Sequence, residues 1–296
     1  MTVRALVVGS LVMDLAFRVS ARPGPGEVII ADEFGQYRGG KGYNQAVALA
    51  RMGAEVAIIG AVGRDAHGDE LIAALTREGV DASRVLQLRA TRTAIAVPLI
   101  TPDGDVGFVQ YPGANRELAP AHCAEIPDCD VLFLQGEIAA STSLHAARVI
   151  RKRGGIVLLN PAPVHVIDDP LLDAATVLVP NEVEARALAD SDVGGAEAAR
   201  LLHRPGQVTV VTLGARGAAW TDDRGSGTLG PPAVNAVDAT GAGDSFCAAL
   251  GLALAEGRPT DAAVAFACAA GAHAATVAGA EPGLPTRQDI EQLLVI

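Results

Sequence analysis

Aromatic residues are scarce in this sequence. Its 296 residues include one Trp, three Tyr and six Phe, whereas half of them are apolar and 33 are glycine. We therefore expect an aliphatic, alanine-rich core with many close backbone contacts. A chain of this length buries a full core without needing disulfides or metal ions as supports.

Clustered positive charge and paired cysteines are also missing. The net charge is −11, and the densest cationic stretch, 148–153, is typical of the solvated end of a helix. Nucleic-acid binding depends on neutralising phosphates, so we expect no nucleic-acid partner. The four cysteines are Cys123, Cys129, Cys247 and Cys268. They form no CxxC pair and no pattern with histidines, which disfavours a zinc site or a disulfide framework and favours a reducing compartment.

Long hydrophobic runs are nearly absent. The stretch Ala262 to Ala280 has the length of a membrane span, but it is mostly Ala and Gly and contains His273. A buried helix is therefore expected there, and no membrane partner. The first nine residues hold a four-residue apolar run, too short for a signal peptide. We expect a cytoplasmic protein.

Short apolar runs alternate with helical patterns along the chain. The expected strands are Ala5–Val8, Val56–Gly60, Val131–Gln135, Ile156–Leu159, Val177–Val179 and Val208–Leu213. The expected helices are Asn44–Arg51, Gly68–Glu78, Ser141–Arg153, Val183–Ala189, Gly241–Glu256, Thr260–Thr276 and Thr286–Leu294. Runs that are apolar on both faces and separated by helices predict a parallel sheet covered on both sides, which is the α/β class.

Two segments interrupt this alternation. Val28–Arg38 and Thr93–Tyr111 are extended in pattern, and the second has Thr101-Pro-Asp-Gly104 at its centre, which predicts a hairpin. We expect them to form a small antiparallel sheet. It would cover the carboxyl ends of the parallel strands as a lid, where ligands bind in open α/β sheets, and would close during turnover to exclude water.

Three matches to short motifs carry no chemistry. Gly225–Gly230 fits GxGxxG, but two prolines follow at once, so no helix can begin there and a turn is predicted. Gly243-Asp-Ser-Phe246 imitates the start of one esterase class, yet no Asp-x-x-His completes a triad. Gly39–Gly42 lacks the spacing of a P-loop, so Lys41 has no Walker role.

The segment Asp238–Phe246 is more informative because it opens a strongly helical run. Gly241 and Gly243 leave backbone N–H groups unobstructed at a helix N-terminus, where unpaired donors and the helix dipole favour an anion such as a phosphoryl group. Asp244 could accept the proton of an attacking hydroxyl, and Asp238 could hold a cation. Alternatively, Asp238 or Thr240 caps the helix and Asp244 complements its dipole.

Other polar residues follow predicted strands. Asn181 and Glu184 have the spacing of a capping box, and the same carboxylate could organise Mg²⁺ and its waters near phosphates. Thr212–Gly217 is either a glycine turn or a close approach to a nucleotide. If Asp14, the run Gly39–Asn44 and Glu137 converge, they would form a site for several hydroxyl groups; singly, each is an ordinary loop residue.

Taken together, these residues resemble the ribokinase-like (PfkB-type) carbohydrate kinases over essentially the whole chain. The resemblance rests on Gly9-Ser10 with Asp14, Pro25–Glu27, Gly39–Ala46, Gly113–Asn115, Asn160–Pro163, Asn181 with Glu184, and Asp238–Asp244. It implies a single kinase domain, 1–296, with a Rossmann-like three-layer α/β fold. A β-sheet lid from about 11–40 and 92–112 is implied, which in this family often contributes to a homodimer.

The resemblance also implies an activity and a role for each matching residue. The activity is transfer of the ATP γ-phosphoryl group to a primary hydroxyl of a sugar. Asp244 is the implied general base, with Gly241, Ala242 and Gly243 as the anion hole. The implied sugar-binding residues are Asp14, Gly40, Lys41, Asn44, Glu137 and Asp244. Asn181 and Glu184 would arrange Mg²⁺ and phosphate, and Thr212 and Gly214 would line the nucleotide pocket. Asp238, Thr240, Ala278, Gly279 and Gly283 would hold K⁺.

Within the family the similarity is greatest to the ribokinases, in the run Gly39–Ala46 and the tail Gly279–Pro285. This implies phosphorylation of D-ribose to ribose 5-phosphate. Val12 stands where those kinases present an Asn to the sugar, which favours a substrate lacking one hydroxyl, such as deoxyribose. Tyr43 could stack on a base or cover a larger sugar, as in a nucleoside or fructose-type hexose kinase. A non-catalytic sugar-binding protein is a further alternative, against which the intact Asp244 argues.

Two other positions depart from the ribokinase pattern. Cys268 stands where an Asn often lies near adenine, and Gly283 stands where a Ser is common at the cation loop. The second departure weakens the expectation of potassium activation.

Overall fold

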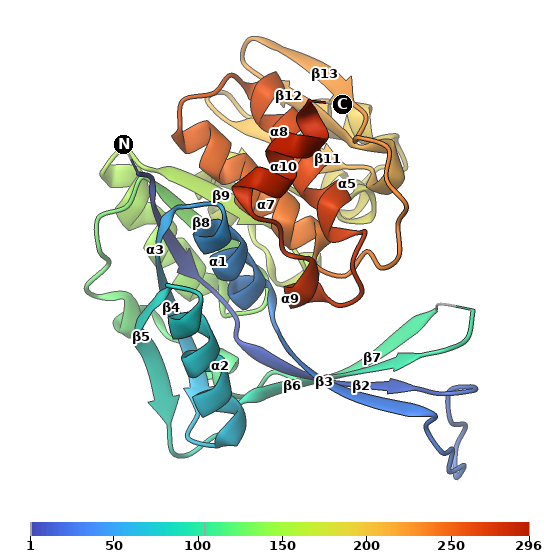
Figure 1. Cartoon of the computed structure of the whole chain (residues 1–296). Coiled ribbons are helices and arrows are strands. Elements are labelled where there is room, and N and C mark those ends of the chain that lie inside the picture. The colour runs from blue at the N-terminus through green and yellow to red at the C-terminus, as the bar shows by residue number, and fades with distance from the viewer. Residues whose placement is uncertain (1, 104, 296) are drawn as a thin grey trace.

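The computed structural model describes residues 2–103 and 105–295, and its main body is a nine-stranded sheet between two layers of helices (Figure 1). The strand order is β13-β12-β11-β10-β9-β8-β1-β4-β5. The strands are β1 Arg4–Val8, β4 Glu55–Gly63, β5 Asp81–Leu88, β8 Val131–Gln135, β9 Ile156–Asn160, β10 Val177–Leu178, β11 Val208–Thr212, β12 Ala218–Asp222 and β13 Gly225–Leu229. Neighbours from β11 to β5 run parallel, whereas β12 and β13 form an antiparallel extension. The expected α/β class is confirmed.

Alternate residues of each central strand pack into two different hydrophobic cores, one on each face of the main sheet. This explains why the main body has three layers, a sheet between two layers of helices. In β1, Ala5 and Val7 belong to one cluster of buried residues, and Leu6 and Val8 belong to another. Successive side chains of a strand point to opposite faces of the sheet, so a strand that is apolar at every position needs a cover on both sides. The helices supply these two covers.

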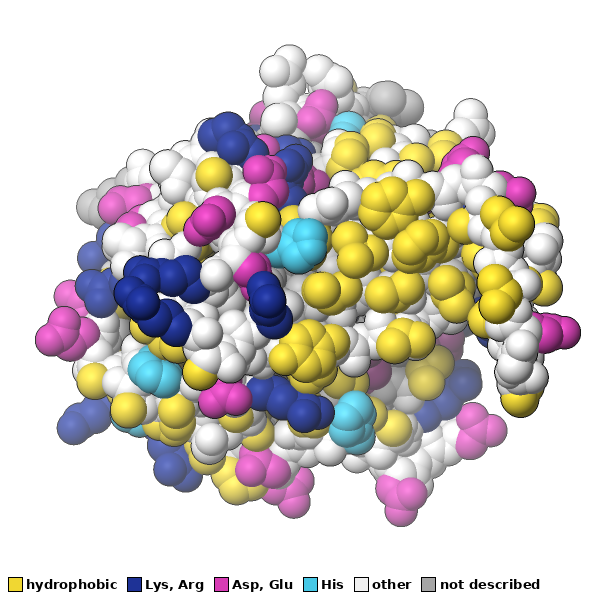
Figure 2. Space-filling model, turned by 90° about the horizontal axis from the view of Figure 1, so that it is seen from below, with side chains coloured by type: hydrophobic (Ala, Val, Ile, Leu, Met, Phe, Trp, Pro, Cys, Tyr) yellow, Lys and Arg dark blue, Asp and Glu magenta, His cyan; other side chains and the backbone are white. Residues whose placement is uncertain are grey.

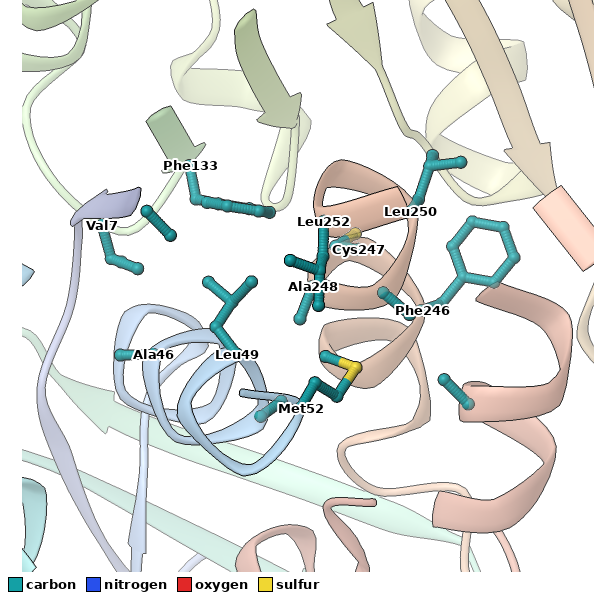
Figure 3. Close-up of a cluster of buried hydrophobic side chains, with 14 of the residues drawn as sticks. Val7, Ala46, Leu49, Met52, Phe133, Phe246, Cys247, Ala248, Leu250 and Leu252 are labelled. Carbon is teal, nitrogen blue, oxygen red and sulfur yellow. The ribbon is translucent and has the colours of Figure 1, made fainter. Parts of the chain in front are cut away.

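The helices divide between the two faces. They are α1 Lys41–Arg51, α2 Ala66–Arg77, α3 Ala140–Lys152, α4 Asp169–Ala174, α5 Glu182–Ala189, α6 Gly195–Leu202, α7 Ala242–Ala255, α8 Thr260–Ala274, α9 Ala280–Gly283 and α10 Arg287–Leu294. Buried residues of α1, α2, α7, α8 and α10 share a core with Val7 and Phe133, whereas α3 and α4 pack on Leu6 and Leu132. Figure 3 shows Leu49 of α1 and Met52, just after the end of α1, facing Ala248 and Leu252 of α7 beneath Phe133.

A second sheet forms the lid, in the order β3-β2-β6-β7. Its strands are β2 Val12–Arg18, β3 Glu33–Gly39, β6 Ala94–Ile100 and β7 Val106–Tyr111. The predicted hairpin is present as β6 and β7, although Gly104 lies outside the described residues. The sheet projects away from the main body (Figure 1).

Two details of the predicted lid were wrong. The sheet is not wholly antiparallel, because β2 follows directly from β1 and pairs parallel with β6. In addition, 28–32 lies outside any strand and the lid strand instead begins at Glu33. The run Pro23-Gly-Pro-Gly26 lies just before this stretch, and proline and glycine favour turns over a strand ladder.

The predicted turn at Gly225–Gly230 was also wrong. Gly225–Leu229 is strand β13, which pairs antiparallel with β12. Gly227 lies opposite Trp220, and a Cβ at Gly227 would come within 2.8 Å of the indole Nε1. The missing side chain therefore makes room for the Trp ring, and the glycine pattern reflects packing in a hairpin.

The alanine-rich stretch that begins at Ala262 lies in the buried helix α8 as predicted as far as Ala274, but residues 275–279 form turns and bends and the stretch does not continue as one helix to Ala280. Within residues 2–103 and 105–295, no helix combines the length and apolarity needed to cross a bilayer.

We predict that Leu49→Ala lowers the free energy of unfolding by about 2–5 kcal/mol, because Leu49 is fully buried between α1 and α7 and its truncation leaves a cavity. Leu201→Ala is the matched control, since Leu201 is 54% exposed on α6, and it should change stability by about 0.5 kcal/mol or less. Urea unfolding of both variants measures the difference; equal losses would contradict this account of the core.

Candidate active site

The predicted site residues gather where the carboxyl ends of β1 and β8 meet the N-termini of α1 and α7. Gly9 and Ser10 follow β1, and Glu137 follows β8. Helix α1 begins beside Ser10, because Gly40 adopts a φ of 92° that few other residues tolerate, and the Tyr43 N–H donates to the Ser10 carbonyl at 3.0 Å. This group of residues therefore lies between the main sheet and the root of the lid.

Asp244 lies at the centre of this region, in the first turn of α7. Its side chain is buried, with Asn44 Nδ2 donating to Oδ2 at 2.8 Å and Gln45 Nε2 donating to Oδ1 at 3.4 Å. Burial raises the pKa of Asp244, while the Lys41 ammonium and the two amide donors oppose that rise. A buried carboxylate that is held by donors yet remains basic is suited to accept a proton.

Gln45 and Gln135 support Asp244, and neither was assigned a role from the sequence. Gln135 Nε2 donates to Gln45 Oε1 at 2.6 Å, which leaves the Gln45 amide nitrogen to face Asp244. A Cβ at Gly9 would lie 2.1 Å from Gln135 Oε1 and 3.0 Å from the Gly42 Cα, so a larger residue there would displace the Gln135 amide from its place beside Gln45. The signal available in the sequence was a glutamine ending the otherwise apolar strand β8.

Glu137 joins the end of β8 to the start of α1. Its Oε2 accepts hydrogen bonds from the Ser10 hydroxyl and, at 2.9 Å, from the Lys41 N–H. The Gly42 N–H donates to the same hydroxyl at 3.3 Å. A carboxylate is favourable at a helix N-terminus, so Glu137 fixes the segment that carries Lys41 and Asn44.

Asp14, on lid strand β2, completes a group of carboxylates. Burial, followed by the charges of Glu137 and Asp244, raises the pKa of Asp14 to about 7. Lys41 is the cation among them: burial lowers its pKa, but Asp244, Glu137 and Glu184 together raise it above the usual value. These charged and amide groups offer the acceptors and donors that several sugar hydroxyls require.

A cavity of about 960 Å³ adjoins the N-terminus of α7 and contains most of the predicted nucleotide residues. Asn181, Thr212, Gly214, Ala242 and Gly243 line it, and Asn181 forms a parallel β-bridge with Thr212. Its volume is in the range of pockets for ligands of nucleotide size. Residues that sequence reasoning missed include Phe246, Leu213 and the prolines at 231 and 232, which give the cavity an apolar wall. Cys268 lies in this wall.

The capping interpretation of Asn181 and Glu184 is confirmed. Asn181 Oδ1 accepts from the Glu184 N–H, and Glu184 Oε2 accepts from the Asn181 N–H, both at 2.8 Å. The second carboxylate oxygen of Glu184 takes no part in this box. Burial raises the pKa of Glu184, and Lys41 opposes that rise. The pair therefore begins α5 and leaves one oxygen available to a hydrated Mg²⁺, an ion that usually keeps several waters.

Asp238 and Thr240 do not cap α7, whose N-cap is Gly241 with a φ of 81°. Instead, Asp238 Oδ1 accepts from the Thr240 N–H at 2.9 Å and from its hydroxyl at 2.6 Å, and Oδ2 accepts from the Gly279 N–H at 2.8 Å. Asp238 thus joins the segment before α7 to the loop 278–283. Its carboxylate provides the hard oxygen that a monovalent cation prefers, and lone pairs remain on it after these contacts.

Two of the remaining predicted residues, Ala242 and Gly283, make specific contacts. The Ala242 N–H donates to the Ala239 carbonyl at 3.1 Å, which leaves the amides of the next residues in α7 to face an anion. Gly283 packs on the end of α8, where a Cβ would lie 2.7 Å from the Ala274 carbonyl oxygen. A serine at this position would press on this carbonyl, so glycine suits the packing here.

Val12 and Tyr43 are both buried. Val12 packs with Ala94 and Ala96 at the root of the lid, so the position is apolar. Tyr43 has no exposed surface and belongs to the main core, so the suggestion that its ring stacks on a base or covers a sugar was wrong. The ring lies with α1 in the main core, close to Arg38 and Glu281, and so away from any ligand. This removes the sequence argument for a nucleoside substrate that was based on it.

Comparison with known proteins agrees with this geometry. The family model for pfkB family carbohydrate kinases matches residues 3–287. Ribokinase from Bacillus subtilis (strain 168) is 35% identical over 292 residues, covering 97% of this chain and 98% of that protein. The crystal structure of ribokinase from Thermotoga maritima superposes with a TM-score of 0.90 at 30% identity, covering 99% of this chain and all of the other.

Ribokinase from Arabidopsis thaliana, solved in complex with ribose and ATP, has a TM-score of 0.89 at 30% identity, with complete coverage of both chains. The similarity thus extends over the main sheet and the lid together. The chain belongs to the pfkB family of carbohydrate kinases.

Proposed function

We propose that this protein transfers the γ-phosphoryl group of ATP to the primary hydroxyl of D-ribose, giving ribose 5-phosphate. The observation that carries the proposal is the position of Asp244. It lies in the first turn of the helix whose N-terminus borders the nucleotide-sized cavity, and it is hydrogen-bonded to Asn44 beside the carboxylates of Asp14 and Glu137. A base at this junction can reach a hydroxyl on one side and a phosphoryl group on the other.

The residues divide the reaction between them. Asp14, Glu137, Asn44 and the Gly40–Lys41 backbone bind the sugar hydroxyls and orient the primary alcohol toward α7. Asp244 accepts the proton of that alcohol as its oxygen bonds to the γ-phosphorus, and the bond to the ADP oxygen breaks. The Gly241–Gly243 segment and the dipole of α7 stabilise the negative charge on the transferred group.

Two cations complete the proposed site. Glu184, with Asn181, would hold hydrated Mg²⁺, which when bound neutralises phosphate charge. Asp238, Thr240, Ala278, Gly279 and Gly283 would hold K⁺ next to the N-terminus of α7. Support for the second site comes from the Asp238–Gly279 hydrogen bond, which brings the two segments together.

The four cysteines are free thiols, which supports our proposal of a cytoplasmic location.

Deoxyribose is a second candidate substrate, and Val12 is the observation that favours it. An apolar side chain at this position offers no partner to a hydroxyl, and a site that leaves a hydroxyl unpaired loses selectivity for the sugar that carries it. The loss of one contact makes 2-deoxyribose a competitor of ribose.

We predict that Asp244→Asn lowers kcat for ribose-dependent ADP release by about 10²–10⁴-fold, because the amide cannot accept the alcohol's proton. Asp192→Asn is the matched control, since that carboxylate is 95% exposed, and its kcat should be unchanged. The assay compares ribose, 2-deoxyribose, fructose and adenosine at saturating ATP. Full activity of Asp244→Asn would refute the role of the base, and selective turnover of another acceptor would replace ribose.

We predict that kcat/KM for the sugar rises with pH through about 7, because the Asp14 carboxyl ionises there and becomes a full acceptor for hydroxyls. The raised pKa also means that the folded state binds a proton more tightly than the unfolded chain. Stability should therefore fall as pH increases from about 4 to about 7 and level off above. In Asp14→Asn both pH dependences should be weaker; an unchanged kcat/KM profile would assign the titration to another group.

We further propose a homodimer formed through the lid. Phe34, Phe108, Val109 and Tyr111 are each at least half exposed, and they come from β3 and β7 at the two edges of the sheet. Figure 2 shows apolar side chains gathered on the side of the molecule where the lid projects. An apolar patch of this kind is typical of a protein interface.

Val109→Asp should convert the protein from about twice the chain mass of 30.1 kDa to the mass of one chain, because the charge would be buried in the interface. Leu201→Asp, an exposed apolar site on α6, is the matched control and should leave the mass unchanged. Sedimentation velocity distinguishes the two masses. A monomeric wild type would refute the proposed dimer.

A further inference from the structure

Arg38 connects the root of the lid to a loop beside the N-terminus of α7. It lies at the end of β3, directly before the Gly39–Lys41 segment. Its guanidinium donates from Nε and Nη2 to the two carboxylate oxygens of Glu281 at 2.5 and 2.9 Å, and from Nη1 to Glu70 Oε1 at 2.7 Å. The Glu281 side chain is only 11% exposed. A two-pronged, partly buried ion pair of this kind fixes direction as well as distance.

Glu281 belongs to α9, which is held in place from two further sides. Arg51 Nη1 donates to the carbonyls of Glu281 and Leu284 at 2.8 and 3.0 Å, while its Nη2 pairs with Glu78 at 2.6 Å. On the opposite side, the Gly279 N–H donates to Asp238. Helix α9 is therefore joined to α1 and to the segment that leads into α7.

The loop also contacts the N-cap of α7 directly. A Cβ at Gly241 would lie 3.1 Å from the Ala280 Cα, so the backbones of Gly241 and Ala280 are packed against each other. A displacement of α9 would consequently move the Gly241 backbone or the Asp238–Gly279 hydrogen bond. The orientation of the amides at the N-terminus of α7 thus depends on where α9 sits.

We propose that Arg38 and Glu281 are a pair of positioning residues that couple sugar binding to nucleotide binding. This inference deepens the proposed function and rests on it. A sugar bound by Asp14 and the Gly40–Lys41 backbone fixes the root of the lid, and Arg38 transmits that position to α9 and hence to the α7 N-terminus. Nucleotide binds more tightly as a result, and by thermodynamic linkage nucleotide strengthens sugar binding by the same factor.

The exposed ion pair Arg18–Glu33 provides a comparison within the same lid. It joins β2 to β3 at 3.1 Å, with side chains 58% and 71% exposed, and it connects two lid strands rather than the lid and the main body. Loss of this pair removes a charge from the lid without cutting the connection to α9. A variant that breaks this exposed pair therefore shows whether a change of charge on the lid alone affects the coupling between the sugar and nucleotide sites.

The test measures the Kd of magnesium and a non-hydrolysable ATP analogue by calorimetry, without sugar and with saturating ribose. In the wild type, ribose should lower this Kd at least about fivefold, the low end of typical coupling. In Arg38→Met and in Glu281→Gln, the ratio of the Kd without sugar to the Kd with ribose should fall below about twofold, and the Kd without sugar should be nearly unchanged. Arg38→Lys should keep part of the ratio because it retains the charge but not the two-pronged geometry.

The controls separate each possible failure. Glu33→Gln, which breaks the exposed pair without touching Arg18, whose charge also acts on Asp238, should keep the wild-type ratio. The double variant Arg38→Met/Glu281→Gln should lose no more than either single change. Thermal melts identify a variant that fails to fold, in which case the nearly isosteric Glu281→Gln carries the test. Two outcomes overturn this inference alone, provided that the wild type phosphorylates ribose. In the first, both variants keep the wild-type ratio of nucleotide Kd values; in the second, ribose does not change the nucleotide Kd of the wild type. Absence of ribose turnover overturns the proposed function and this inference with it.

Discussion

The burial of the Asp244 carboxylate is the constraint on which the rest of the site depends. A charge removed from water is costly unless donors and an opposite charge replace the lost solvation. Asn44, Gln45 and Lys41 do this from α1. Because all three come from one helix, the packing of α1 against α7 through apolar residues such as Leu49 and Leu252 sets the position of the proposed base (Figure 3). The aliphatic core therefore fixes the geometry of the proposed site.

Much of the architecture could be predicted from the sequence because its signals are local. An apolar strand such as Val131–Gln135 and the helix beginning near Gly241 are set by residues close in the chain. Strands β5 and β13 could not be found in this way, since each contains polar residues or glycine and gains its order from a neighbour. β5 pairs with β4, and β13 is shaped by Trp220 of β12. Edge strands depend on tertiary contacts more than on their own pattern.

The residues of the site likewise divide into those marked by a local sequence pattern and those brought together only by the fold. The Asn181–Glu184 box joins residues three positions apart, and its geometry was predicted from that spacing. Gln135 meets Gln45 across 90 residues, and Arg38 meets Glu281 across 243, so no local pattern marks either pair. Motif residues can also be structural: buried Asn115 accepts from the Leu11 N–H and donates to the Leu11 carbonyl, which holds the chain between β1 and the lid.

The continuity of β1 and β2 explains why a lid and a catalytic domain act together in this fold. The chain leaves the main sheet at Val8, passes Ser10 beside Glu137, and enters the lid at Val12, so Asp14 is only a few residues from the carboxyl end of β1. It returns through β3, whose last residues lead straight into α1 and Asn44. The two chain segments that connect the lid to the main body here, from β1 to β2 and from β3 to α1, both carry proposed sugar ligands. In the proposed function, a sugar bound to them would restrain the hinge of the lid, and the Arg38–Glu281 pair and helix α9 join that hinge to α7.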